Sequence, residues 1–251
     1  MRCVAGFKVV QRLALGSGSL ALVTAMVTSL LTACGSGSSE PSFYPLNEGK
    51  SWTYRVTKNL DEATEPDVDT VVFTMKGPQT LESGPAQRRH SSNGLDYFLR
   101  SDDQGIYRVG SRDTLEVNPK ADNPPRFVLK KPVVVGTQWQ ATTMPYVLQR
   151  RNEFPKEVRY TTKPIMMVYA IAALNEKVET PAGAFEGCIK VVGEAKIRLY
   201  VDAQFNWREI PLFSTEWYCP GAGLVKVQRV EDTPSKFMRG GSQTLELLSY
   251  R

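Results

Sequence analysis

Apolar and polar side chains alternate in the segment Ser51-Trp52-Thr53-Tyr54-Arg55-Val56-Thr57. Successive side chains of a β-strand point to opposite faces of its sheet, so Trp52, Tyr54 and Val56 would share one face. Aromatic and β-branched residues also pack well on a half-buried pleated surface. The segment therefore predicts a β-strand with one face toward a core.

The same period of two recurs along the chain, and no segment after Cys34 keeps apolar residues at helical spacing over three turns. In Leu224–Val230, for example, Val225 and Val227 alternate with Lys226 and Gln228. Further strands are predicted at Val68–Met75, Tyr97–Arg100, Ile106–Val109, Arg126–Leu129, Val158–Thr162, Ile165–Ala172, Gly187–Val192, Ala195–Val201, Thr215–Tyr218 and Thr244–Leu248. A short helix would also fit Ile165–Ala172.

Turn-forming pairs are expected to separate the strands at Gly77-Pro78, Asn93-Gly94, Pro124-Pro125 and Gly240-Gly241. Many short strands joined by turns predict an all-β fold, in which an antiparallel meander forms a curved sheet, a half-barrel, a barrel or a sandwich.

One turn pattern occurs twice, as Pro-x-x-x-Gly-x-x-Trp at Pro45–Trp52 and at Pro132–Trp139. Proline ends the preceding strand, glycine permits a positive φ, and tryptophan begins the next strand facing the core. We interpret the repeat as two similar turns that cap one core. The functional alternative is a pair of aromatic gates that clasp a ligand.

The first 33 residues have the order of a secretory signal peptide, with a basic start, an apolar stretch and a small-residue site ending at Ala33. The sequence Leu31-Thr32-Ala33-Cys34, which covers the end of this leader and the first residue after it, resembles the lipobox of bacterial lipoproteins. The resemblance implies cleavage before Cys34, diacylglycerol on its thiol and often an acyl chain such as palmitate on the new amino group. An ordinary secretory leader with an accidental cysteine is the alternative.

Residues 34–43 are rich in glycine and serine and predict a flexible tether, followed by a single β-rich periplasmic domain over residues 44–251. Gly35, rather than aspartate, follows the cysteine. By resemblance to Gram-negative lipoproteins, this favours a lipid-anchored position in the cell envelope, at the outer membrane and facing the periplasm.

Three motifs of the domain resemble those of a broad group of uncharacterised exported bacterial proteins. They are Tyr44-Pro45-Leu46 with Gly49, Trp52 and Tyr54; Pro181-Ala182-Gly183-Ala184-Phe185-Glu186-Gly187-Cys188; and Tyr218-Cys219-Pro220-Gly221-Ala222-Gly223-Leu224-Val225. The resemblance implies a compact β domain and no known activity. Cys219 departs from the pattern, because a small residue such as alanine is usual there.

Four cysteines are present in the chain. Cys3 would leave with the leader and Cys34 would carry lipid, so Cys188 and Cys219 remain as a pair. Such a pair usually forms a disulfide in an oxidising compartment. The alternative is a buried free Cys188 and an incidental Cys219.

The charge of the mature chain is nearly balanced. Removing Arg2, Lys8 and Arg12 from the 31 basic residues leaves 28 against 26 acidic ones, a net charge of +2. A nucleic-acid partner is therefore not expected, because such proteins cluster many cations on phosphates.

No catalytic, cofactor-binding or metal-binding residues are predicted. The only histidine, His90, lies in the polar segment Arg88–Gly94, expected to be an exposed loop, and no Gly-x-Ser-x-Gly, phosphate-binding loop or Cys-x-x-Cys follows Cys34. Solvated loops are also expected for the acidic pairs Asp61-Glu62, Asp102-Asp103 and Glu231-Asp232, and a solvated face for the basic residues Arg150, Arg151, Lys156 and Arg159.

These features predict an anchored envelope lipoprotein that is not an enzyme, with a binding or structural β domain and with a membrane, an envelope protein or an apolar ligand as partner. The alternative is a periplasmic carrier of an apolar ligand, a lipid or lipoprotein-like molecule, in a half-barrel cavity. That alternative requires an open apolar cavity.

The lipobox yields a direct prediction. Replacing Cys34 by serine should abolish both processing and membrane retention, because serine is a poor nucleophile for the lipid transfer. Fractionation of the native host followed by immunoblotting measures both. A variant still cleaved before residue 34 and recovered with the envelope would show that no lipid anchor forms there.

Overall fold

The computed structural model describes residues 42–151, 165–200, 206–235 and 238–251. These residues belong to one compact unit, Glu40–Arg251. The described part contains strands and no helix, and thus no helix that could cross a membrane. The predicted leader, the lipobox with Cys34 and all but the last two residues of the tether lie outside the described residues, as does the predicted strand Val158–Thr162.

The strands in chain order are β1 (Ser51–Leu60), β2 (Asp67–Leu81), β3 (Gly84–Ser91), β4 (Asp96–Ser101), β5 (Gly105–Arg112), β6 (Lys120–Lys130), β7 (Gln138–Thr143), β8 (Gln149–Arg150), β9 (Ile165–Thr180), β10 (Gly183–Tyr200), β11 (Trp207–Cys219), β12 (Gly223–Glu231), β13 (Met238–Arg239) and β14 (Gly241–Tyr250).

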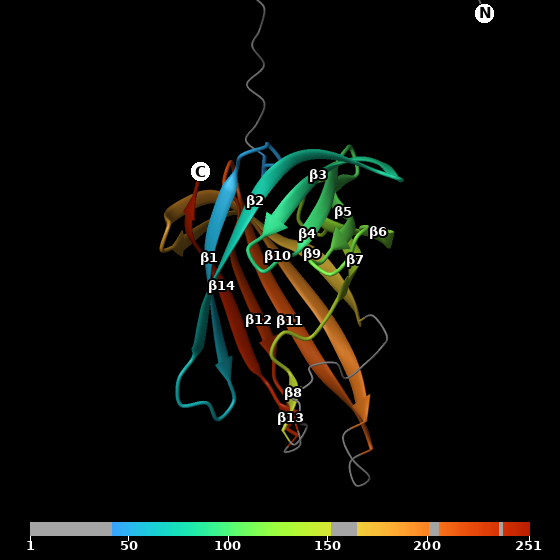
Figure 1. The fold of residues 1–251 in the computed structure, drawn as a ribbon. Coiled ribbons are helices and arrows are strands. Elements are labelled where there is room, and N and C mark those ends of the chain that lie inside the picture. The colour runs from blue at the N-terminus through green and yellow to red at the C-terminus, as the bar shows by residue number, and fades with distance from the viewer. Residues whose placement is uncertain (1–41, 152–164, 201–205, 236–237) are drawn as a thin grey trace, which may run out of the picture. The chain divides into compact units, whose positions relative to one another are not determined.

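Twelve of these strands form one antiparallel sheet in the order β6-β5-β4-β3-β2-β1-β14-β12-β11-β10-β9-β7, and β8 pairs with β13 separately (Figure 1). The sheet curls until it is nearly closed into a barrel. Its two edge strands, β6 and β7, are linked where Arg126 Nε donates to the Thr142 carbonyl at 2.9 Å. The predicted all-β antiparallel meander is confirmed, with the barrel as its form.

The sheet consists of two six-stranded meanders, β1–β6 and the set β7, β9–β12 and β14, joined by the pairing of β1 with β14. The register runs from Trp52 opposite Tyr250 to Leu60 opposite Gly241. Beyond it, Ser51 and Arg251 exchange both backbone hydrogen bonds, at 3.1 and 3.0 Å. The last strand of the chain therefore completes the sheet begun by the first.

The two Pro-x-x-x-Gly-x-x-Trp turns have the same hydrogen bonds, as predicted for similar turns. Gly49 N–H donates to the Met75 carbonyl at 3.0 Å, and Gly136 N–H donates to the Ile171 carbonyl at 2.9 Å. Both glycines have positive φ, 83° and 92°. The expectation of one shared core is wrong, because Trp52 and Trp139 belong to separate apolar clusters on different strands.

Two predicted strand breaks are also wrong. Gly77-Pro78 lies within β2 and Pro124-Pro125 lies within β6, each at a shift of register with the neighbouring strand. Such a bulge removes the need for a ladder hydrogen bond that proline cannot donate. Ile165–Ala172 is the start of strand β9 rather than a helix, and the strands predicted at Gly187–Val192 and from Ala195 onward are one strand, β10.

The β9–β11 wall is filled with apolar side chains. Along β10, buried Val191, Ala195, Ile197 and Leu199 alternate with polar residues. Gly193 continues this inward row, and a Cβ there would lie 2.8 Å from the Tyr169 ring. Its missing side chain leaves room for Tyr169, which stacks on Trp139 at a centroid distance of 5.7 Å.

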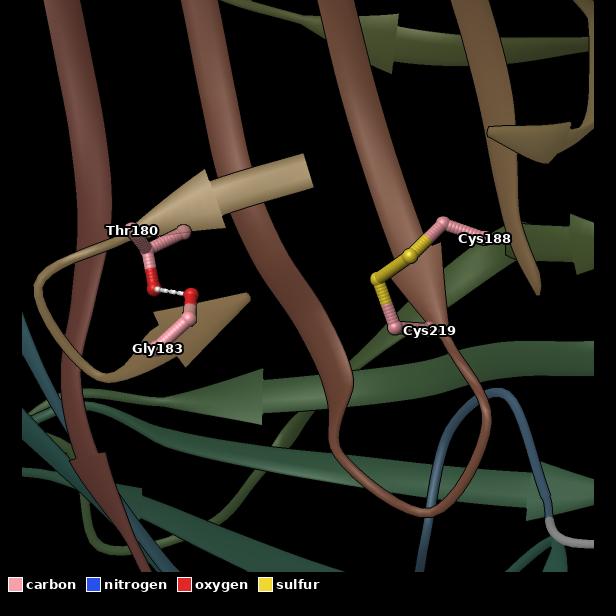
Figure 2. The surroundings of a disulfide bond; sticks show 4 residues. All are labelled: Thr180, Gly183, Cys188 and Cys219. Atoms are coloured by element: carbon pink, nitrogen blue, oxygen red, sulfur yellow. Dashed lines mark hydrogen bonds between the residues drawn. A yellow bond between two sulfur atoms is a disulfide. The ribbon is translucent and has the colours of Figure 1, made fainter. Parts of the chain in front are cut away.

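A disulfide joins Cys188 of β10 to Cys219 at the end of β11 (Figure 2). The preceding pair in register is Ile189 opposite Tyr218, so the cysteines face each other across adjacent strands. Both are fully buried. The nearby β9–β10 turn is closed by a hydrogen bond of 3.5 Å from Thr180 Oγ1 to the Gly183 carbonyl.

The disulfide spans a sequence separation of 31 residues. Replacing both cysteines by alanine should lower the free energy of unfolding by roughly 3–4 kcal/mol, because the open chain regains loop entropy when it unfolds. Urea titration measures the change, with the reduced wild-type protein as the matched control. Alkylation of the unreduced wild-type protein should label neither cysteine, and labelling of both would contradict the disulfide.

Candidate ligand-binding cavity

The barrel encloses a cavity of about 630 Å³ that is lined from both meanders. Its polar lining includes five tyrosines, three arginines and one acid: Tyr44, Tyr54, Tyr97, Tyr146, Tyr218, Arg89, Arg108, Arg126 and Glu216. Its apolar lining includes Phe73, Leu99, Val128, Met144, Leu224, Val227 and Leu245. One cavity thus offers both a greasy surface and strong hydrogen-bond donors.

Arg89 of β3 is the most deeply buried cation of this lining, with 8% of its surface exposed. Its guanidinium lies 4.2 Å from the centroid of the Phe73 ring and 5.2 Å from that of Tyr44, whose hydroxyl accepts a hydrogen bond from Nη1. Among the described residues no carboxylate pairs with Arg89, and its buried Nε has no hydrogen-bond partner. Aromatic faces and tyrosine hydroxyls thus take the place of a counter-charge.

Arg108 of β5 and Arg126 of β6 lie directly opposite each other in register. Arg108 is neutralised by Asp122, which accepts from Nε at 2.6 Å and from Nη2 at 2.8 Å. For Arg126 the structure gives only the bond to the Thr142 carbonyl described above, and no carboxylate of the described ranges pairs with it. Burial alone would lower the pKa of Arg126, but Tyr169, Tyr146 and Glu216 raise it above its ordinary value, so Glu216 compensates part of this charge without forming an ion pair.

Glu216 of β11 is the acid in the lining, and two hydroxyls hold it. Ser214 Oγ lies 3.2 Å from its Oε1, and the Tyr218 hydroxyl donates to its Oε2. Burial and the charge of Glu216 together raise the pKa of Tyr218 well above its ordinary value. Tyr218 therefore stays protonated and remains a hydrogen-bond donor.

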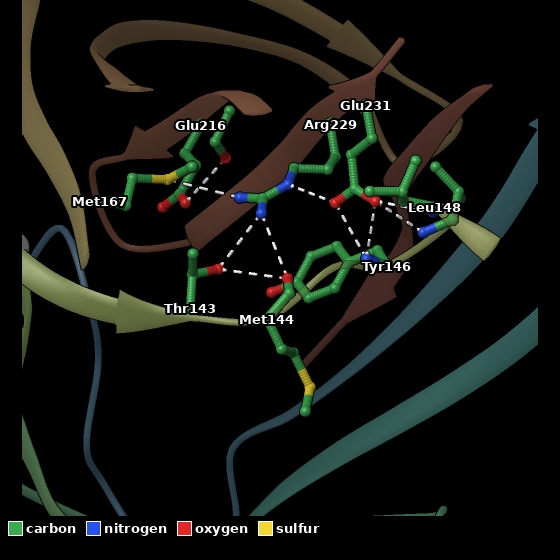
Figure 3. Close-up of polar contacts among 10 residues, drawn as sticks. Thr143, Met144, Tyr146, Leu148, Met167, Glu216, Arg229 and Glu231 are labelled. Atoms are coloured by element: carbon green, nitrogen blue, oxygen red, sulfur yellow. Dashed lines mark hydrogen bonds and ion pairs between the residues drawn. The ribbon is translucent and has the colours of Figure 1, made fainter. Parts of the chain in front are cut away.

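A buried ion pair fixes the segment from Met144 to Leu148 beside the cavity (Figure 3). Glu231 accepts hydrogen bonds of 2.9 Å from the backbone N–H groups of Tyr146, Val147 and Leu148. Arg229 Nε pairs with Glu231 at 2.9 Å, and the Arg229 guanidinium lies 4.8 Å from the Tyr146 ring centroid. Tyr146 and Met144, which both line the cavity, are positioned by this pair.

A second, more open hollow of about 710 Å³ lies against the segment Ser42–Glu48 and strands β3 to β5. Tyr44 and Leu99 line both hollows. The inner cavity is the better candidate for a binding site, because it holds the buried charges and draws side chains from both meanders.

His90 is not in a loop, contrary to the prediction. It lies on β3, next to inward-facing Arg89, and its side chain pairs with Asp96 through Nδ1 and Oδ1 at 2.8 Å. Burial alone would raise the pKa of Asp96, but hydrogen bonds from Arg112 and His90 lower it below its ordinary value. His90 does not line the cavity.

The pairs Asp61-Glu62 and Asp102-Asp103 lie in loops as predicted, and Glu62, Asp102 and Asp103 are exposed. Asp61 accepts a hydrogen bond from Gly240 N–H at 3.0 Å, Glu62 pairs with Arg151, and Asp102 accepts one from the Tyr107 hydroxyl at 2.7 Å. Glu231 differs most from the expectation, because it is fully buried on β12. Of the predicted basic cluster, Lys156 and Arg159 lie outside the described residues.

Glu231 and Arg229 could have been predicted from the sequence. They continue the alternation from Val227, so a longer β12 places Val227, Arg229 and Glu231 on one face. Arg89 carries no such signal, because its segment has no clear alternation. No cluster of three or more potential metal ligands occurs in the described ranges.

No family model matches the chain, and no curated protein matches it. Two solved structures are similar in fold. Each match covers 84% of this chain and 99% of the chain in the solved structure. One is from Parabacteroides distasonis and is provisionally described as a lipoprotein, with 15% sequence identity and a TM-score of 0.37. The other is from Bacteroides fragilis and is provisionally described as an exported protein with a YmcC-like fold, with 16% identity and a TM-score of 0.40.

The Arg229–Glu231 pair yields a stability prediction. Replacing Glu231 by glutamine should lower the free energy of unfolding by about 3–5 kcal/mol, because it leaves Arg229 buried without a counter-charge. Adding Arg229→Met should recover part of the loss. The matched control is Glu209→Gln in the exposed Lys196–Glu209 pair. This substitution should change the free energy of unfolding by less than about 1 kcal/mol. Urea titration measures the free energy of unfolding of each variant. Equal losses in Glu231→Gln and Glu209→Gln would show that the buried pair contributes no more to stability than the exposed one.

Proposed function

We propose that this protein is a lipoprotein of the bacterial cell envelope, anchored through Cys34 and facing the periplasm at the outer membrane, whose β domain binds a small ligand in the barrel cavity. The position rests on the signal sequence and the lipobox. The disulfide supports it, since disulfides persist in oxidising compartments.

The single observation that carries the binding proposal is the cavity itself. Its volume of about 630 Å³ lies within the range of roughly 300–1,000 Å³ that is typical of small-molecule sites. A purely structural domain gains stability by filling such a space, because each cavity costs dispersion contacts and hydrophobic free energy. The open interior thus favours binding over a scaffold role.

The polar residues of the lining argue against the alternative of a purely apolar ligand. A hydrocarbon that filled the cavity would remove the remaining water from Arg89 and Arg126 without replacing its hydrogen bonds. We therefore infer an amphipathic ligand, whose apolar part packs on residues such as Phe73 and Leu245 and whose polar part meets the arginines.

We propose binding without catalysis. Among the described residues that line the cavity there is no histidine or cysteine, and the carboxylate of Glu216 is already held by two hydroxyls. A general acid–base pair needs a group that is free to gain and lose a proton near the operating pH.

The binding proposal is tested with the neutral dye N-phenyl-1-naphthylamine, whose fluorescence rises in apolar surroundings. The wild-type protein should enhance the fluorescence saturably. Gln243→Trp places a large side chain in the cavity and should weaken dye binding about tenfold or more, because the ring occupies the ligand's space. Gln228→Trp adds the same ring at an exposed position of β12 and is the matched control. Absence of dye binding, together with no co-purified molecule in native mass spectra, would overturn the proposal.

A further inference from the structure

We propose that the ligand is an amphipathic monoanion, a compact acidic group on an apolar body, and that Arg89 and Arg126 recognise its charge. The inference rests on the proposed binding function and deepens it, because it names the chemistry of the ligand. A fatty acid and a phospholipid, whose phosphodiester carries one negative charge, both belong to this class.

The charges of the cavity do not cancel. Three arginines line it, whereas the compensating acids are Glu216 in the lining and Asp122 beside Arg108, which leaves a net charge of +1. The Arg229–Glu231 pair nearby is neutral as a unit. One negative charge on a ligand would therefore complete the balance.

Arg89 is the group whose surroundings most need that charge. A buried guanidinium normally has a carboxylate or several oxygen acceptors, since desolvation of an ion costs several kcal/mol. Among the described residues Arg89 has instead two tyrosine hydroxyls, those of Tyr44 and Tyr54, and the faces of three aromatic rings, with its Nε unpartnered. This arrangement keeps the cation charged but leaves its hydrogen bonding incomplete.

The arginines lie along one wall of the barrel, on strands β3, β5 and β6, and β4 lies between the first two. Arg89 of β3 is opposite Tyr97 of β4 in register, and the Arg108 guanidinium lies 5.6 Å from the Tyr97 ring centroid. Arg108 is in turn opposite Arg126. An acid held against this wall would have cationic donors on either side of Tyr97.

The apolar part of the lining completes the description of the ligand. Phe73 lies beside Arg89, with its ring against the guanidinium. Val227 and Leu245 are opposite each other in register on β12 and β14. A ligand whose acid lies at the arginines can thus bury a hydrocarbon body on these residues. Inorganic anions alone would leave that surface unused.

The experiment measures displacement of N-phenyl-1-naphthylamine by dodecanoate and by dodecanol, which share one apolar body. In the wild-type protein dodecanoate should bind about tenfold more tightly or better, as expected for a hydrogen bond to a charged group. Arg89→Met should remove this preference, because it should weaken dodecanoate binding much more than dodecanol binding. Arg198→Met, which removes an arginine from the exposed face of β10, is the matched control and should keep the preference.

Further arms separate the possible outcomes. Arg126→Met should reduce the preference in part, and it tests the inference independently if Arg89→Met fails to unfold cooperatively. Methyl dodecyl phosphate, a phosphodiester with a single negative charge, binding more tightly than dodecanoate assigns the acid to a lipid phosphate, and the reverse assigns it to a carboxylate. Equal binding of dodecanoate and dodecanol in the wild-type protein overturns this inference while the binding function stands. Displacement by inorganic phosphate at the same concentration as dodecanoate overturns the amphipathic ligand.

Discussion

The pairing of β1 with β14 is the constraint on which the rest of the structure depends. It joins residues separated by almost the whole length of the domain, and it converts two six-stranded meanders into one twelve-stranded sheet. Without it each meander would expose an additional strand edge, with unpaired backbone groups that favour aggregation. The remaining edges, β6 and β7, are brought together by the curvature of the joined sheet, and Arg126 links them.

A barrel of this many strands is too wide for its own side chains to fill completely, because the diameter grows with the number of strands. The two sides solve this problem differently. The β9–β11 wall packs apolar side chains to a dense core around Tyr169 and Trp139. The β2–β6 wall instead projects aromatic rings and arginines into the open space. The cavity exists because only one wall is built as a conventional core.

The buried charges serve different purposes according to their partners. Arg229 and Glu231 neutralise each other and fix the backbone of the segment from Met144 to Leu148, so their role is to position Tyr146 and Met144. No acid in the part of the chain that the structure describes neutralises Arg89, and Arg89 fixes no loop of this kind. A buried cation without a counter-charge costs stability, and the anionic ligand that we propose accounts for that cost.

How far the sequence could predict this protein depends on the range of the interactions involved. Strict alternation at Trp52 and Tyr54, or at Val225 and Val227, is local, so the all-β class, most strands and the turns at Gly49 and Gly136 were predictable from the chain alone. The strand breaks predicted at Gly77-Pro78 and Pro124-Pro125 were wrong, because a bulge between neighbouring strands lets each proline remain within a strand. The closure of the sheet, the burial of Glu231 and the meeting of Arg89, Arg126 and Tyr218 around one cavity were decided only by the tertiary structure. One physical reason explains why these three features were not predictable: each depends on which distant strands become neighbours. A period of two in the sequence shows which side chains share a face, but not which faces come together.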